Sequence, residues 1–216
     1  MTAVSPRTLA LVLVGATALV LLAMIGLSLA TGASQEVHEH YQAPATYAAH
    51  LLEHPGALRV MMGLDVAFLV LYTAFFAALA QVLAGRPFVR LALGAMVATA
   101  VLDIIEDHRI LASLGMAEAN RPIDDATIAW QQVISSTKFS LSYLSLVLFG
   151  LAIPRTTRLG VALALFLTVG TLATGVLGFA APPAWQDSLD GGRWLGFLAG
   201  FALAALWLRR APDQGV

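Results

Sequence analysis

Residues 96–110 read Met-Val-Ala-Thr-Ala-Val-Leu-Asp-Ile-Ile-Glu-Asp-His-Arg-Ile, an apolar segment that ends in a run of charged residues. Because positions three and four apart are neighbours on a helix, Asp103 shares one face with Glu106 and Asp107. Thr99 extends this face by one turn. An ionisable group within a membrane-spanning segment is costly and generally faces a partner or a water-filled cavity. The stretch therefore predicts a functional site inside a membrane helix.

The composition of the whole chain is that of a membrane protein. Of its 216 residues, 59% are hydrophobic and 12% are charged, whereas soluble domains have about 45–50% apolar and about 25% charged residues. The net charge of −1 provides no basic surface for nucleic acid. The absence of cysteine excludes disulfides, thiolate metal ligands and thiol catalysis. The lipid bilayer is therefore the expected surrounding.

The hydrophobic runs predict an all-α integral membrane protein, a bundle of six transmembrane helices that forms a single domain over residues 1–216. Each run is long enough for a hydrocarbon core that needs about 20 helical residues. The expected spans are 8–30, 58–83, 88–108, 127–152, 158–180 and 192–209.

The arginines predict the orientation of the bundle, because basic residues are enriched on the cytoplasmic side. The first set lies at the N-terminus, in the second and fourth connections and at the C-terminus: Arg7, Arg86, Arg90, Arg155, Arg158, Arg209 and Arg210. The other side carries the smaller set: Arg59, Arg109, Arg121 and Arg193. We therefore expect both termini in the cytoplasm of a multi-pass cell-membrane protein, of the bacterial inner-membrane kind.

The first extracytoplasmic loop, residues 31–57, is long and rich in histidine. His50 and His54 are spaced to share one helical face, and His108 lies on the same side of the membrane. Imidazole and carboxylate together suit a divalent metal such as zinc, although no established ligand motif is present. The alternative is an amphipathic surface segment whose histidines and glutamates are wetted. No other cofactor is implied.

A polar stripe follows the fourth expected span. Its members recur at intervals of three and four: Gln131, Ser135, Lys138, Ser142 and Ser145. Lys138 lies roughly 16 Å inside the membrane at about 1.5 Å per residue, and a buried ammonium needs a counter-charge. Asp65, which shares a face with Tyr72, and Asp103 lie at matching depths and are its expected ion partners.

This constellation defines the candidate site. We expect catalytic roles for Asp65, Asp103, Glu106 and Lys138, and binding roles for Tyr72, Gln131, Ser135 and Ser142. The structural alternative is a buried ion pair that only fixes helix packing, with serines bonded between helices. The number of polar groups exceeds what one structural pair needs and favours a hydrated cavity.

The run Leu102-Asp103-Ile-Ile-Glu106-Asp107, followed by Lys138-Phe139 in the next span, resembles a pattern of uncharacterised bacterial multi-span membrane proteins. Those show Asp-x-x-Glu-Asn at a helix end and a later Lys-Phe or Lys-Trp, and Asp107 departs from this pattern. The resemblance covers two spans and implies that Asp103, Glu106 and Lys138 belong together. It implies no activity.

Three functions fit these observations. In the first, the protein binds or acts on a lipid-like or small amphiphilic substrate from the outer leaflet, with Asp65 and Asp103 as acid and base. Alternatively, it is a non-catalytic accessory or assembly subunit, which implies a membrane-complex partner or a second copy. The third alternative is a proton- or ion-coupled transporter, in which the serine stripe lines a path inward.

Overall fold

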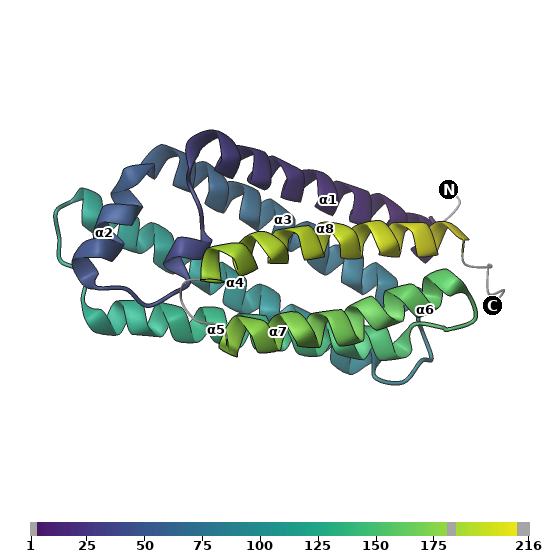
Figure 1. Ribbon diagram of the computed structural model, residues 1–216. Coiled ribbons are helices and arrows are strands. Elements are labelled where there is room, and N and C mark those ends of the chain that lie inside the picture. Colours follow the sequence, from purple (N-terminus) through teal and green to yellow (C-terminus); the bar gives the residue numbers. More distant parts are fainter. Residues whose placement is uncertain (1–3, 181–184, 211–216) are drawn as a thin grey trace.

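Long helices lie side by side in an elongated bundle (Figure 1). The computed structural model describes residues 4–180 and 185–210, which form helices and no strands. The elements in chain order are α1 Pro6–Thr31, η1 Glu36–His38, α2 Pro44–Glu53, α3 Pro55–Val82, α4 Val89–Glu118, α5 Asp125–Ala152, α6 Arg158–Leu165, η2 Phe166–Gly170, α7 Thr171–Ala180 and α8 Gln186–Arg210. The π-helical turn η2 joins α6 and α7 into one continuous helical segment.

Polar side chains determine where several of these helices begin. Ser5 accepts a hydrogen bond from the Thr8 backbone N–H at 3.2 Å, and Pro6 occupies the first helical position of α1. Asp124 caps α5 by accepting from the Thr127 N–H at 2.7 Å. These caps satisfy backbone donors that have no partner within the helix.

Among the described residues, five helical segments are long and apolar enough to cross a membrane, as a membrane protein requires. They are 6–31, 55–82, 125–152, 158–180 and 191–210, close to five of the six expected spans. The remaining expected span, 88–108, corresponds to the first two thirds of α4, whose acidic residues lower its hydropathy. The ends of the chain, residues 1–3 and 211–216, lie outside the described residues.

Helix α4 is longer than expected, because it continues to Glu118 through residues predicted to be a loop. Ile110, Leu114 and Ala117 follow one another at helical spacing and are buried against Tyr47 and Leu51 of α2. The predicted loop 31–57 therefore contains a helix, α2, that covers an extension of α4 at the end of the bundle.

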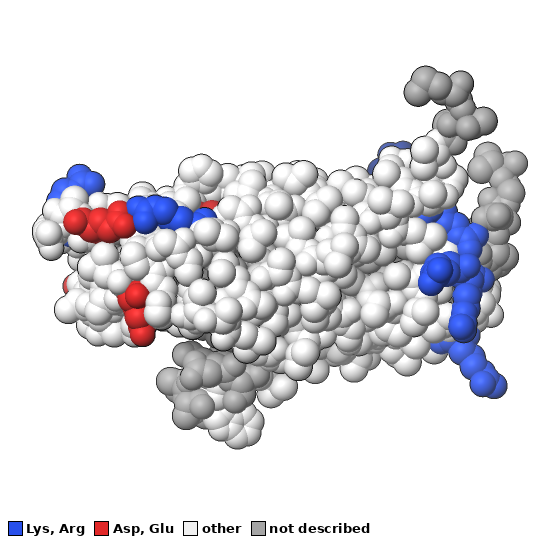
Figure 2. Space-filling model, turned by 90° about the horizontal axis from the view of Figure 1, so that it is seen from above, with Lys and Arg blue, Asp and Glu red and all other residues white. Residues whose placement is uncertain are grey.

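The start of α1 and the end of α8 lie at the same end of the molecule. Arg7 donates hydrogen bonds to the backbone carbonyls of Leu208 and Arg209, the latter at 2.9 Å. In Figure 2 only basic residues are coloured at this end, whereas the opposite end shows both signs. A broad band without coloured residues separates the two ends, as expected for a surface in contact with hydrocarbon.

A layer of buried polar groups separates two apolar cores. We call the core that contains Tyr47 and Leu51 of α2 the outer core, and the core that contains Ala10 and Leu208 near the chain ends the inner core. On α3, Asp65 lies between Met62 of the outer core and Leu69 of the inner core. On α4 the acids lie between Ala100 of the inner core and Ile110 of the outer core. We call this set the polar layer: Asp65, Asp103, Glu106, Asp107, Gln131, Ser135 and Lys138, all buried. It contains the candidate site.

Candidate functional site

Lys138 lies at the centre of the polar layer and is only 5% exposed. Its ammonium donates to two acids of α4: to Asp103 Oδ1 at 2.9 Å, and to Glu106. Glu39, from the loop between α1 and α2, lies 3.7 Å away. Three carboxylates from two segments therefore surround one cation, which compensates part of the cost of burying it.

Arg193 links α8 to the same cluster. Its guanidinium donates to Glu39 Oε2 at 2.9 Å and lies 4.0 Å from the centroid of the Phe139 ring. Lys138 lies 4.7 Å from the same centroid. Glu39 is therefore held between two cations from helices that are far apart in the sequence.

Asp65 belongs to a second group of the layer, in which its hydrogen bond comes from Gln35 rather than from the Lys138 ammonium that we expected as its partner. Gln35 donates to Asp65 Oδ2 at 3.2 Å and to Asp107 Oδ1 at 3.4 Å. The buried Oδ2 of Asp107 has no hydrogen-bond partner among the described residues. The Gln35 amide therefore joins the two acids of this group.

Loop 32–43, which joins α1 to α2, folds into the bundle. Gln35, Glu36, His38 and Glu39 are all buried, so this part of the loop is not the wetted surface segment considered as an alternative. Gln35 and Glu39 of the loop contact side chains of the helices. Glu36 accepts a hydrogen bond from Ser34.

Burial in this loop changes the ionisation of its side chains. Desolvation and the nearby Glu39 charge raise the pKa of Glu36. Desolvation and the proximity of His50 lower the pKa of His38 to about 4, which leaves this imidazole neutral at pH 7. For Glu39, burial is opposed by the charges of Arg193 and Lys138, which hold its pKa below the ordinary value.

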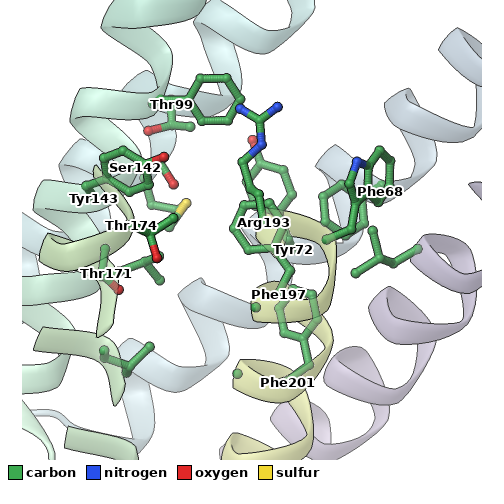
Figure 3. A pocket seen from close by; sticks show the side chains of 18 of the residues that line it. Phe68, Tyr72, Thr99, Ser142, Tyr143, Thr171, Thr174, Arg193, Phe197 and Phe201 are labelled. Atoms are coloured by element: carbon green, nitrogen blue, oxygen red, sulfur yellow. The ribbon is translucent and has the colours of Figure 1, made fainter. Parts of the chain in front are cut away.

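A cavity of about 230 Å³ adjoins the polar layer. Its polar end is lined by Gln35, Glu36, Glu39, Asp65, Asp103, Lys138 and Arg193. The rest is lined mainly by aromatic and aliphatic side chains, among them Phe68, Phe75, Phe76, Met96, Phe166, Phe197 and Phe201. Figure 3 shows Thr171, Thr174, Ser142 and Tyr143 on one wall, facing Arg193, Phe197 and Phe201 of α8. The cavity is thus amphipathic along its length.

A shallower groove on α7 meets this cavity at Tyr143 and Thr171, which line both. Gly175 lets the Tyr143 ring lie close to α7, because a Cβ there would be 2.9 Å from the ring atom Cδ2. The π-helical turn η2 lies directly before Thr171, and such turns often occur at functional sites. The groove extends the cavity toward the outer surface of the bundle.

The predicted site residues fall into two groups. Those that line the cavity are Asp65, Tyr72, Asp103, Lys138 and Ser142, and Tyr72 donates to Asp103 Oδ2 at 3.0 Å. The others lie beside it: Ser135 donates to Glu106, and Gln131 accepts from Arg109 at 3.2 Å. Gln131 and Ser135 therefore support the layer rather than face the cavity.

The histidines proposed as metal ligands have separate surroundings. His50 Nδ1 is 2.7 Å from Gln42 Oε1, the His54 ring packs beside Gly32, and His108 bonds the Ile104 carbonyl at 2.8 Å. Within residues 4–180 and 185–210 no three His, Cys, Asp or Glu side chains form a metal-binding group. The metal site stays a prediction.

Four further residues belong to the site without having been assigned to it from the sequence: Gln35, Glu36, Glu39 and Arg193. The run Gln35–His40 is unusually polar, but it has no periodicity that would indicate a buried face. No family model, curated protein or solved structure matches this chain.

Proposed function

We propose that this chain is a six-span membrane protein that binds an amphipathic small molecule or lipid. The observation that carries the proposal is the cavity of about 230 Å³, which is charged at one end and aromatic along the rest. A polar head group would lie beside Asp103 and Lys138, and an apolar chain would lie among the phenylalanines of α3 and α8. Ligand sites commonly combine an apolar lining with a few polar groups in this way.

Six crossings are supported by the position of the chain ends. Arg7 at the start of α1 bonds backbone carbonyls at the end of α8, and both ends of a chain lie on one side only after an even number of crossings. The five strongly apolar segments therefore need α4 as a sixth. Its acids face Lys138 and Gln35 inside the bundle, where the cost of their charge is reduced.

The arginine-rich end supports a cytoplasmic location for both termini. The polar end of the cavity then lies in the outer half of the membrane, beneath loop 32–43 and α2. In this orientation the amphiphile's head group lies near the outer interface, and its apolar part extends toward the membrane centre.

The cavity favours binding over a purely structural role for the charge cluster. An ion pair that only fixes packing needs no adjoining space, and side chains that line an unfilled space lose the van der Waals contacts that they would otherwise make. A ligand that fills the cavity supplies these contacts.

The inner half of the bundle gives no support to the transporter alternative. Ser145, the innermost member of the polar stripe, donates to the Ala92 carbonyl at 2.7 Å. Phe75, Leu79 and Phe149 are buried in the inner core. The polar lining is therefore not continued toward the cytoplasmic end by these residues.

The proposal is tested by mass spectrometry of the intact protein, purified in mild detergent, with Gly196→Leu as the blocking variant. Gly196 lines the cavity, and a Cβ there meets no atom within 4 Å, so leucine would fill the space without displacing the backbone. Gly15→Leu is the matched control, because Gly15 is exposed on α1. We expect an amphiphile that stays bound to the wild type and to Gly15→Leu but not to Gly196→Leu. Equal retention by all three proteins, or by none, would contradict the proposal.

A further inference from the structure

We infer that the ligand's head group is a protonated amine, which Glu36 and Asp65 hold at the polar end of the cavity. The inference rests on the proposed function, because it assigns a chemical class to the molecule in that cavity. The inference comes from comparing the hydrogen-bond donors with the hydrogen-bond acceptors among the residues that line the cavity.

The charged and amide donors at this end, Lys138, Arg193 and Gln35, each have an acceptor within the protein, which for Arg193 is Glu39. Lys138 faces Asp103, Glu106 and Glu39, and Tyr72 donates to Asp103. The two amide hydrogens of Gln35 are directed to Asp65 and Asp107. An anionic head group would have to take these donors away from buried carboxylates, which would then be left unpaired at high cost.

Acceptors, by contrast, are in surplus. An ionised carboxylate has about four lone-pair sites, and a protonated carboxyl keeps part of this acceptor capacity. The hydrogen bonds that Glu36 and Asp65 accept come from the neutral side chains of Ser34 and Gln35. Both carboxyls line the cavity and are buried. They therefore have room to accept N–H donors from a ligand.

The balance of charged residues around the polar end of the cavity also favours a cationic head group. The polar layer and the polar end of the cavity contain two basic side chains, Lys138 and Arg193, and a larger set of acids: Glu36, Glu39, Asp65, Asp103, Glu106 and Asp107. Glu39, Asp103 and Glu106 form ion pairs with these bases, so the acids outnumber the basic side chains. A ligand cation beside Glu36 and Asp65 would compensate negative charge in a region where water cannot.

The aromatic lining next to these acids fits an alkylammonium rather than a bare ion. Phe68 and Tyr72 follow Asp65 along α3, pack edge to face with ring centroids 5.3 Å apart, and line the cavity. Ring faces attract organic cations and also contact the carbons next to the nitrogen. The remainder of the cavity accepts an alkyl chain.

The test uses the full-length protein in lipid nanodiscs and four probes that share a ten-carbon chain: decylamine, decyltrimethylammonium, decanol and decyl sulfate. Binding is measured as the rise in melting temperature with probe concentration, since a ligand of the folded state stabilises it. We expect decylamine to bind at least tenfold more tightly than decanol or decyl sulfate. The quaternary probe, which has no N–H donor, binds more weakly than decylamine.

Two variants locate the head group: Glu36→Gln and Asp65→Asn should each weaken decylamine at least tenfold and leave decanol unchanged. Glu53→Gln is the control, because Glu53 is exposed on the same side of the bundle. If Asp65→Asn does not fold, Glu36→Gln alone decides. Preference for decyl sulfate or decanol, or undiminished decylamine binding by the variants, would overturn the amine assignment but retain the amphiphile site. If no probe binds, the proposed function itself fails.

Discussion

Lys138 of α5 and Arg193 of α8 lie over the same aromatic ring, that of Phe139, at 4.7 Å and 4.0 Å from its centroid. Both cations also contact Glu39 of loop 32–43. One loop carboxylate thus joins two helices that are separated by a long stretch of sequence. The loop is part of the site's wall, and its position depends on both cations.

Replacement of Lys138 by methionine should destabilise the protein strongly. The change leaves Asp103, Glu106 and Glu39 without their shared cation, and breaking a buried ion pair costs about 3–5 kcal/mol. We expect a large fall in melting temperature in detergent, partly reversed when Asp103→Asn is added, because the two residues are in contact. Gln132→Leu, at an exposed position of the same helix, is the control. A melting temperature equal to that of the control would refute a structural contribution from the ammonium.

Replacement of Arg193 by glutamine should loosen loop 32–43 while the helices stay folded. Glu39 would lose its 2.9 Å contact and keep only the longer one to Lys138. Hydrogen exchange of the loop amides should become faster by tenfold or more, whereas amides of α4 keep their protection. Arg59→Gln serves for comparison, since its ion pair with Glu118 is exposed and such pairs contribute about 0–1 kcal/mol. Equal loop exchange in the two variants would count against the proposed tie.

Protonation of His38 should destabilise the folded loop in acid. Because its folded pKa of about 4 lies below the ordinary 6.5, the unfolded chain binds more protons between these values, and stability falls as the pH decreases through this window. His38→Phe keeps the ring contact with Tyr47, at 5.5 Å between centroids, and removes the titration.

The measurement is the difference in melting temperature between wild type and His38→Phe from pH 7 to pH 4. As the pH falls, the melting temperature of the wild type should decrease relative to that of His38→Phe. A difference that is independent of pH would mean that His38 is not neutralised by burial. The comparison cancels titrations that both proteins share, such as that of Glu36.

Replacement of Gly175 by alanine should displace the Tyr143 ring, since the new Cβ would lie 2.9 Å from Cδ2. Overpacking of this kind costs about 1–3 kcal/mol, and the displaced ring should change access between the α7 groove and the cavity. Gly178→Ala is the matched control on the same helix, with no atom within 4 Å of its Cβ. We expect a lower melting temperature and slower probe binding for Gly175→Ala only. Identical behaviour of the two variants would exclude a role for Tyr143 between the two spaces.

The sequence predicts the membrane helices well, because an apolar run of about 20 residues is a strong signal. The convergence of Asp103, Glu106 and Lys138 is likewise predictable, since helical spacing and matching depth bring them to the same level. The C-terminal end of α4 is not, because the charged run Glu106–Arg109 interrupts the apolar segment and suggests that the helix ends there. Only the position of α2 explains why that helix continues.

The loop residues could not be assigned in the same way. Gln35, Glu36 and Glu39 lie in a segment with no long helix, and their partners are up to 154 positions away in the sequence. Asp65 illustrates the consequence: its depth suggests a pair with Lys138, whereas Gln35 from the loop is the residue that bonds it. When an irregular segment folds against the helices, its side-chain contacts leave no periodic pattern in the amino-acid sequence from which they could be predicted.

The acids of α4 also have a consequence for how the protein is made. A carboxylate near the middle of a helix opposes release of that helix from the translocon into lipid. For an aspartate, the free energy of insertion becomes less favourable by about 2.5–3.5 kcal/mol. On the six-span arrangement proposed above, α4 is therefore a poor independent insert, and its favourable partner, Lys138, is synthesised only with the following helix. The two would leave the translocon as a hairpin, with their charges already neutralised against each other. The same ion cluster that lines the cavity of the folded protein would then already assist insertion of α4 into the membrane.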